Sequence, residues 1–279
     1  MNLPPLNIAA LLREHHLAPK KGLGQNFLSD PTALQRIVAA AEIPPGCDVL
    51  EVGPGLGSLT RYLAQVAAHV VAVELDATLL PALHQVLADQ TNVTVVQGDV
   101  LELEPADWLP SPGYWVVANI PYYITSAIIR HLLEARSRPG RMVLTVQREV
   151  AERICAGPGD LSLLALSVQV YGQPRTVLRI PAGAFYPPPN VDSAVVRIDL
   201  AAEPFIPAGQ IEDFFKLARA GFSQKRKTLR NSLSGGLHCS GDQAAELLRA
   251  AGIDPQRRAE TVSIEEWREL TAQYTQKMA

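Results

Sequence analysis

The sequence predicts an α/β fold of the Rossmann-like type, with a mostly parallel sheet, followed by a small all-α C-terminal domain. Three features of the chain predict it. Short runs rich in β-branched residues alternate with longer helical stretches from about residue 48. A glycine-rich turn follows the first of these runs, and the strand pattern stops after Leu200. Such alternation is typical of a parallel sheet with helices on both faces.

The expected strands are short and apolar, and helical stretches separate them. The core of the predicted sheet consists of Val49–Val52, His69–Glu74, Val93–Gln97, Trp115–Asn119 and Met142–Val146. The helices expected between and after these strands are Ser58–Val66, Ala77–Ala88, Ser126–Ala135 and Arg148–Ala156. Two later apolar runs, Leu163–Tyr171 and Ser193–Leu200, predict additional strands at one edge of the sheet.

The region after Leu200 has a different character. Glu203–Pro204 and Pro207–Gly209 are typical of a linker. The segments with helical signatures are the amphipathic stretch Ile211–Gly221 and the capping-box patterns Ser240–Gln243 and Ser263–Glu266. We therefore expect two domains, at residues 1–202 with an N-terminal arm at 1–30, and at residues 203–279.

The composition limits the possible functions. The chain has 279 residues, of which 47% are hydrophobic and 19% are charged, and this balance supports a large folded core. A net charge of −3 argues against a protein that binds nucleic acid with its whole surface, so RNA contacts must come from local basic patches. The N-terminus lacks the apolar run of a signal peptide, and no run reaches membrane-spanning length. Cys47, Cys155 and Cys239 lack metal-ligand spacing. We expect a cytoplasmic protein without a metal ion, and a monomer by default.

The turn after the first expected strand has the sequence Glu51-Val-Gly-Pro-Gly-Leu-Gly57. Gly53 and Gly55 allow a tight turn and close approach of a ligand to the backbone. The spacing differs from the dinucleotide fingerprint G-x-G-x-x-G and from the phosphate loop. Glu74 ends the second strand, where a carboxylate can accept both ribose hydroxyls of a nucleotide. Asp99 follows the third strand and can accept from an adenine amino group. The alternatives are a plain tight turn for the glycines and a turn or capping role for Asp99.

The segment Asn119-Ile-Pro-Tyr122 follows the fourth expected strand. The lone pair of an adenine N6 atom is delocalised into the ring, so this nitrogen is a poor nucleophile. Two acceptors directed at its hydrogens, the Asn119 side-chain oxygen and a backbone carbonyl near Ile120 or Pro121, favour a more nucleophilic, pyramidal nitrogen. Pro121 restricts the loop dihedral angles, and Tyr122 offers a flat face for an extruded base. The two motifs predict methyl transfer from S-adenosyl-L-methionine to an adenine amino nitrogen, with DNA and RNA equally open.

Catalysis of this kind depends on positioning and electrostatics. Methyl transfer from a sulfonium is an in-line displacement, and the amino group can lose its proton after the attack. The sequence contains no nucleophile elbow, no zinc-ligand set and no carboxylate pair that would support hydrolysis.

Several motifs carry a resemblance to a known family over nearly the whole chain. They are Lys20–Leu28, Glu51–Gly57, Glu74–Asp76, Gly98–Asp99, Asn119–Tyr122, Gln147–Arg153, Phe185–Ser193 and Phe222–Asn231. With these motifs the chain closely resembles the bacterial small-subunit (16S) rRNA adenine N6,N6-dimethyltransferase family. It departs from the family pattern at Leu23, where an aromatic residue is usual, at Arg148, where lysine is common, and in a shorter 157–162 loop.

The resemblance implies a fold and a function. It implies a Rossmann-like class I methyltransferase domain that transfers two methyl groups to the N6 atom of each of two adjacent adenines near the 3′ end of 16S rRNA. The reaction is a late step of small ribosomal subunit assembly. The positions implied for the cofactor pocket are Asn26, Leu28, Gly53, Glu74, Asp99 and Asn119, to which the turn geometry adds Gly55. The positions implied to flank the target adenine are Tyr122 and Phe185.

Phe185 and the basic clusters suit an RNA substrate. An aromatic residue ahead of the rigid Pro187–Pro189 run is held away from the chain and can supply a second ring for the base. A core or hinge aromatic is the alternative. The basic residues expected to contact phosphates are Lys20, Lys21, Lys225, Arg226, Lys227 and Arg230. For any one of them, a solvated surface position is the alternative.

Three other functions compete with this prediction. The first is a large-subunit rRNA adenine methyltransferase of the macrolide-resistance type, which shares the cofactor and Asn-x-Pro-Tyr motifs. The Phe222–Asn231 and Arg257–Ser263 segments and the low net charge favour the small-subunit enzymes instead. The second is an assembly factor that acts mainly by binding the small subunit. The third, a nicotinamide dehydrogenase, is disfavoured by the glycine spacing.

Overall fold

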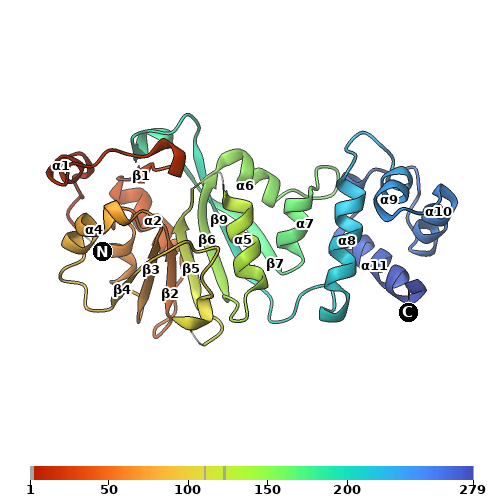
Figure 1. Cartoon of the computed structure of the whole chain (residues 1–279), viewed down its shortest axis with the longest axis horizontal. Helices are drawn as coiled ribbons and strands as arrows, with labels where there is room; N and C mark the ends of the chain where they lie inside the picture. The colour runs from red at the N-terminus through yellow and green to blue at the C-terminus, as the bar shows by residue number, and fades with distance from the viewer. Residues whose placement is uncertain (1–2, 110, 122–123, 279) are drawn as a thin grey trace. The chain divides into compact units, whose positions relative to one another are not determined.

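The computed structural model of the chain describes residues 3–109, 111–121 and 124–278. The chain forms two compact units (Figure 1). The first unit consists of Met1–Ala151 and Arg175–Leu200, and it contains nearly all of the β-sheet. The second consists of Glu152–Pro174 and Ala201–Ala279, and it is mainly helical. The segment Glu152–Pro174 thus groups with the C-terminal helices, although it precedes the expected boundary at residue 203.

The first unit is built on a seven-stranded sheet with the strand order β4-β3-β2-β5-β6-β9-β7. The strands are β2 (Val49–Val52), β3 (Val70–Glu74), β4 (Val93–Gln97), β5 (Trp115–Asn119), β6 (Arg141–Gln147), β7 (Gly172–Ile180) and β9 (Ser193–Leu200). Strands β2 to β6 pair in parallel, whereas β9 is antiparallel to β6. The chain runs from β2 outward to β3 and β4, and then returns to β5 on the other side of β2. The topological switch point of the sheet therefore lies between β2 and β5.

Both faces of the central strands are buried. Val143 of β6 and Val195 of β9 join a core cluster beneath helix α2 (Pro31–Ala41). Their chain neighbours Leu144 and Val196 are also 0% exposed, and they point to the opposite face because successive strand residues alternate. Burial on both faces explains why these strands are continuous apolar runs in the sequence.

The other elements that begin in the first unit are helices and a small ribbon. They are α1 (Ile8–Glu14), β1 (Phe27–Leu28), α3 (Thr60–Leu63), α4 (Leu80–Val86), α5 (Thr125–Glu134), α6 (Arg148–Ile154) and β8 (Phe185–Tyr186). Helix α5 lies in front of the sheet in Figure 1 and buries Ile128, Ile129 and Leu132. Strands β1 and β8 form a separate antiparallel pair.

One predicted strand is wrong, and one strand of the seven-stranded sheet escaped prediction. Leu163–Tyr171 was expected at the sheet edge, but Leu163–Gln169 forms helix α7. The Ser162 hydroxyl accepts from the Ala165 N–H at 3.2 Å and caps this helix, and leucine, alanine and glutamine favour helices. The edge position belongs to β7, where Pro174 is tolerated because an edge strand has unpaired backbone groups. The predicted strand Ser193–Leu200 is confirmed as β9.

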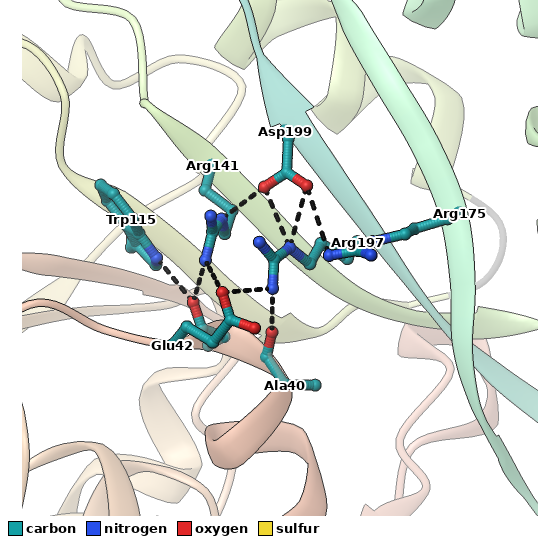
Figure 2. Close-up of polar contacts among 8 residues, drawn as sticks. Ala40, Glu42, Trp115, Arg141, Arg175, Arg197 and Asp199 are labelled. Carbon is teal, nitrogen blue, oxygen red and sulfur yellow. Dashed lines mark hydrogen bonds and ion pairs between the residues drawn. The ribbon is translucent and has the colours of Figure 1, made fainter.

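The end of α2 is fixed to the sheet by a cluster of charged residues (Figure 2). Arg197 of β9 donates to the Ala40 carbonyl at 3.1 Å and to Asp199, and it pairs with Glu42 at 2.8 Å. Arg141 of β6 donates to the Ala41 carbonyl at 2.8 Å and pairs with the same two carboxylates. The last carbonyls of a helix lack partners within the helix, and their partial negative charge attracts cations. The two arginines therefore cap α2 from the sheet.

Arg197→Ala is expected to lower the free energy of unfolding by about 2–3 kcal/mol, because Arg197 is only 5% exposed and its charge-assisted hydrogen bonds would be lost. Arg175→Ala is the matched control. The Arg175 side chain is 57% exposed and reaches Asp199 only at 3.6 Å, so its loss is expected to cost less than about 1 kcal/mol. Urea denaturation of both variants measures the difference, and equal effects would contradict a capping role for Arg197.

The second unit is a helical cluster. After α7 it contains α8 (Ile211–Phe222), α9 (Leu229–Leu237), α10 (Gly241–Ala250) and α11 (Ile264–Met278). Trp267 is 0% exposed and stacks with Phe222, with ring centroids 5.9 Å apart. The predicted capping box at Ser240–Gln243 is confirmed. At the start of α11, Ser263 and Glu266 exchange backbone and side-chain hydrogen bonds, and Arg257 pairs with the Glu266 carboxylate.

Candidate functional site

The glycine turn and the Asn119 segment meet at the switch point of the sheet. The glycine turn follows β2, and Asn119 is the last residue of β5. A Cβ atom built on Gly53 would lie 4.0 Å from both the Asn119 carbonyl oxygen and Pro121 Cδ. Gly53 and Gly55 have positive φ angles of 69° and 59°, a conformation that glycine adopts without strain. The two motifs, 66 residues apart from Gly53 to Asn119, therefore form one site.

A cleft with about 780 Å³ of empty space lies at this point and opens to solvent. Segments from the N-terminal arm and from the carboxyl ends of four neighbouring strands line it. The lining residues are Leu23, Gly24, Gln25, Asn26, Phe27, Val52, Gly53, Gly55, Val73, Glu74, Leu75, Leu79, Gly98, Asp99, Val100, Asn119, Ile120, Pro121 and Ile124. Ligands of open α/β sheets bind at this kind of location.

Glu74 lines the cleft and is buried, with 6% of its surface exposed. One carboxylate oxygen accepts from the Gly55 N–H at 2.9 Å, and the other accepts from the Asp76 N–H at 2.8 Å. Burial raises the pKa of Glu74, and these backbone hydrogen bonds oppose the rise. Each oxygen has a further lone pair, so the fixed carboxylate can accept two hydroxyl groups of a ligand.

The Asn119 side chain has a defined orientation. Its Nδ2 donates to the Asn26 carbonyl oxygen at 3.2 Å, so Oδ1 remains as the acceptor. The Pro121 carbonyl oxygen already accepts from the Ile124 N–H at 3.3 Å and from the Thr125 hydroxyl at 3.4 Å. This leaves the Ile120 carbonyl as the better candidate for a second acceptor. The segment can therefore present oxygen atoms to an amino group.

Asp99 lies at the other end of the cleft lining. Its Oδ1 accepts from the Leu101 N–H at 2.9 Å and stabilises the turn after β4. The turn role and the ligand role considered for Asp99 are compatible, because Oδ2 is a separate acceptor. Gly98 lets this turn pack closely, since a Cβ there would lie 2.9 Å from Leu103 Cδ1.

The ribbon of β1 and β8 places the adjacent residues Phe185 and Tyr186 on opposite faces. Phe27 pairs with Tyr186, and Leu28 pairs with Phe185. Directly opposite residues of an antiparallel pair lie on the same face. Leu28 and Phe185 belong to the core cluster, each 3% exposed. Phe27 lines the cleft, so Tyr186, at 43% exposure, is on the face of the ribbon that carries the cleft residue.

The structure thus brings together most of the predicted site residues. Asn26, Gly53, Gly55, Glu74, Asp99, Asn119 and Pro121 line the cleft. The side chains of Leu28 and Phe185 lie in the core instead. Burial in the core differs from the exposed position expected for Phe185, and the ring would have to move to contact a base. Tyr122 lies outside the described residues.

The predicted RNA-contacting residues fall into two groups. Lys21 and the run Lys225–Lys227 are exposed. Lys20 and Arg230 are engaged within the protein: Lys20 Nζ lies 2.7 Å from Asp76 Oδ1, and Arg230 donates to the Gly241 carbonyl and pairs with Asp242. The sequence alone could not separate Lys20 from Lys21, because both belong to one basic pair.

Several apolar and polar residues that line the cleft were not among the predicted site residues. Phe27 packs against the glycine turn, since a Cβ on Gly55 would lie 2.9 Å from Phe27 Cδ1. Leu75 lines the cleft and is 46% exposed, which is unusual for leucine. Gln25 also lines it. Their positions in the sequence could have indicated this, because Gln25 and Phe27 flank Asn26 and Leu75 follows Glu74.

Residues 3–109, 111–121 and 124–278 contain neither a metal-ligand cluster nor a membrane-spanning helix. No group of three or more His, Cys, Asp or Glu side chains in these ranges is arranged to hold a metal ion. Within the same ranges, no helix combines the length and the apolar character that crossing a membrane requires.

The fold and the cleft together define the class of protein. The fold is that of a class I methyltransferase. Its features are a mostly parallel seven-stranded sheet with an antiparallel strand beside β6, a glycine turn after β2 and an acid at the end of β3. The chain is a methyltransferase that takes its methyl group from a donor of the S-adenosylmethionine type.

More particularly, the chain belongs to the ribosomal RNA adenine dimethylase family, whose model matches residues 17–276. It is 48% identical to the Ribosomal RNA small subunit methyltransferase A of Dehalococcoides mccartyi strain CBDB1, over 95% of this chain and 91% of that protein. The protein of the same name from Moorella thermoacetica is 43% identical, over 96% of both chains.

Two solved structures show the same fold over most of the chain. A dimethyladenosine transferase from Plasmodium falciparum matches with a TM-score of 0.77 and 25% identity, over 90% of this chain and 98% of that one. The 23S rRNA methyltransferase ErmE matches with a TM-score of 0.71 and 31% identity, over 89% and 99%.

Proposed function

We propose that this protein dimethylates the N6 atoms of two adjacent adenines near the 3′ end of 16S rRNA in the small ribosomal subunit, with S-adenosyl-L-methionine as the methyl donor. The single observation that carries the chemistry is the oriented Asn119 side chain beside the cleft. The names of the relatives support the small subunit as the substrate. Action on assembling subunits implies a cytoplasmic location.

The cleft fits S-adenosyl-L-methionine by its donor and acceptor groups. Glu74 is proposed to accept both ribose hydroxyls, because its two oxygens are fixed by the Gly55 and Asp76 N–H groups. Asp99 Oδ2 is proposed to accept from the adenine amino group, with Leu75 and Val100 as apolar neighbours. The glycine turn and Asn26 would hold the methionine portion. When bound, the cofactor supplies an electrophilic methyl group.

The target adenine is proposed to enter beside Asn119. Asn119 Oδ1 and the Ile120 carbonyl would accept from the amino group and concentrate its lone pair toward the methyl carbon. The Asn26 carbonyl keeps Nδ2 of Asn119 turned away from the target. Because these acceptors are preorganised, catalysis arises from orientation and electrostatics. Tyr122 is proposed to stack on the base.

Phosphate contacts are proposed for the exposed basic residues. Lys21 and the exposed run Lys225–Lys227 can reach solvent and neutralise phosphates. Arg230 can contribute only if it leaves Asp242, whose side chain is itself 99% exposed. These local patches let a protein with a net charge of −3 bind RNA.

The test of the function uses purified ribosomal subunits that lack the modification. With labelled S-adenosyl-L-methionine, label is expected in dimethyladenosine of 16S rRNA from small subunits. The 31% identity with ErmE makes large-subunit RNA the second candidate substrate, so large subunits are assayed in parallel. Label in large-subunit RNA alone, or in neither RNA, would overturn the proposal.

Phe185→Ala is expected to affect folding stability, whereas Tyr186→Ala is expected to affect the KM for the substrate. Truncation of the buried Phe185 should cost about 3–5 kcal/mol of folding stability. Tyr186 is exposed and is proposed to stack on a base of the RNA. Its truncation should leave stability nearly unchanged and raise the KM for small subunits about tenfold, because base stacking is typically worth about 1–3 kcal/mol. Thermal denaturation and steady-state methylation measure both. Tyr186→Phe keeps the ring and should restore KM; failure of this rescue would contradict a stacking role.

A further inference from the structure

Asp76 lies two residues after the proposed ribose-binding carboxylate and is 5% exposed. Both of its carboxylate oxygens are used by the N-terminal arm. Lys20 Nζ donates to Oδ1 at 2.7 Å, and Gln25 Nε2 donates to Oδ2 at 2.8 Å. A buried carboxylate that receives hydrogen bonds on both oxygens from one distant segment fixes that segment in place.

The contacts of Asp76 form a closed set, which we call the Asp76 cluster: Lys20, Gln25, Asp76 and Thr78. The Lys20 N–H donates to Gln25 Oε1 at 2.8 Å, so the two arm residues also hold each other. Lys20 Nζ donates to Thr78 Oγ1 at 3.1 Å, and Thr78 donates to Asp76 through its N–H and its hydroxyl. Burial alone would raise the pKa of Asp76, but hydrogen bonds from Lys20, Thr78 and Gln25 outweigh it and hold the pKa at about 2. Asp76 is therefore charged throughout the physiological range.

The segment held by this cluster is part of the cleft wall. Leu23, Gly24, Gln25, Asn26 and Phe27 all line the cleft. The Asn26 carbonyl orients the catalytic amide of Asn119. The main-chain N–H of Asp76 meanwhile donates to Glu74 at 2.8 Å. Asp76 thus contacts the proposed ribose-binding carboxylate of Glu74 through its backbone and the N-terminal arm through its side chain.

We propose that Asp76 is a positioning residue that closes the N-terminal arm over the methyl donor, and that Lys20 acts with it inside the protein and does not contact RNA phosphate. This inference rests on the proposed cofactor site. Loss of the cluster is expected to release residues 21–27 from the cleft wall. Since the arm must then be ordered at each binding event, the bound cofactor should dissociate faster.

The adjacent lysines provide a matched pair of variants. Lys20→Ala removes the ammonium bound to Asp76, whereas Lys21→Ala removes an exposed ammonium from the same basic pair. Affinity for S-adenosylhomocysteine and S-adenosyl-L-methionine is measured by calorimetry on the full chain without RNA. Lys20→Ala is expected to weaken both at least threefold, and Lys21→Ala is expected to leave both unchanged. Lys20→Arg should restore most of the affinity. For small-subunit binding, Lys21→Ala should have the larger effect.

Asp76→Ala is expected to weaken cofactor binding at least tenfold, comparable with Glu74→Ala, which loses two charge-assisted hydrogen bonds to the ribose. Asp76→Asn keeps one acceptor oxygen and should lie between Asp76→Ala and the unmodified protein. Hydrogen exchange in residues 21–28 is the second readout, because a loss acting only through Glu74 would not accelerate it. Acceleration in Asp76→Ala and Lys20→Ala, with the rest of the first unit unchanged, would support the inference.

The outcomes separate this inference from the proposed function. Equal cofactor affinities for Lys20→Ala and Lys21→Ala would overturn it, and so would weakened binding without faster exchange in the arm. If Asp76→Ala fails to fold, Lys20→Ala decides, because Lys20 is half-exposed and its loss leaves Asp76 and Gln25 in place. Failure of the unmodified protein to bind either S-adenosyl-L-methionine or S-adenosylhomocysteine would instead overturn the proposed function.

Discussion

Asn119→Ala is expected to lower the rate of methyl transfer by about 10²- to 10³-fold, the usual effect of removing one preorganised polar group that acts on the reacting atoms. The substitution removes Oδ1, which is proposed to accept from the adenine amino group. It also removes Nδ2, which is bound to the Asn26 carbonyl. Single-turnover methylation of small subunits at saturating cofactor measures the effect.

Cofactor and subunit binding are the controls for this variant. Asn119 is only one of many residues that line the cleft, so cofactor affinity is expected to fall less than about fivefold. Affinity for the small subunit should remain normal, because the substitution leaves the basic residues untouched. A variant that binds subunits without methylating them would show that binding and catalysis are separate roles. A rate loss explained entirely by weaker cofactor binding would contradict the assignment of Asn119 to the reacting amino group.

The core of the site could be predicted because each part has a local pattern. Glycines that follow an apolar strand, an acid that ends the next strand and an Asn-x-Pro-Tyr segment after another strand can each be recognised in a short window. The parallel sheet then brings them together, since the carboxyl ends of neighbouring parallel strands lie at one edge. Glu74, Asp99 and Asn119 meet at the cleft for this reason.

The arm and its contacts could not be predicted in the same way. Lys20 and Asp76 are 56 residues apart, and no local pattern indicates that one will bind the other. A pair of lysines in a sequence suggests a phosphate contact whether or not a buried carboxylate takes one of them. Strands β1 and β8 have two residues each, too few for an alternating pattern. Their register nevertheless decides that Phe185 faces the core and Tyr186 the opposite face.

The wrong strand at Leu163–Tyr171 has a different cause. A short apolar run fits a buried strand and a buried helix equally well. The Ser162 hydroxyl caps this segment at its N-terminus and thereby favours the helix. The role of Arg197 could not be predicted either. A charged residue within an apolar strand pattern gives no sign that it will be buried. Its partners at the end of α2 come from a segment about 157 residues away.

Glu51, the first residue of the glycine motif, is expected to make the stability of the protein depend on pH. It is 1% exposed in β2, and burial, together with the nearby Glu74 carboxylate, raises its pKa to about 8. The nearby Thr60 hydroxyl opposes this rise by favouring the charged form, but burial is the larger effect. Glu51 is therefore neutral in the folded protein at pH 7.

A carboxyl group with a raised folded pKa destabilises the folded state at high pH. Below about pH 4.5 it is protonated in both states, so it contributes no pH dependence. Between about 4.5 and 8 the unfolded chain has lost this proton while the folded chain retains it, and folding becomes less favourable by about 1.4 kcal/mol per pH unit. Above about pH 8 both states are ionised and the penalty no longer grows.

Glu51→Gln should remove this dependence, because glutamine is a neutral side chain of the same shape. The unfolding free energy of the variant minus that of the unmodified protein is expected to rise by a few kcal/mol between pH 5 and 8. Urea denaturation at several pH values measures it, and Glu102→Gln, at an exposed position, is the matched control. Titrating groups that do not interact with Glu51 cancel in the difference between the two proteins. A difference that stays constant across this range would mean that Glu51 is already ionised in the folded state, and that two buried carboxylates lie side by side beneath the glycine turn.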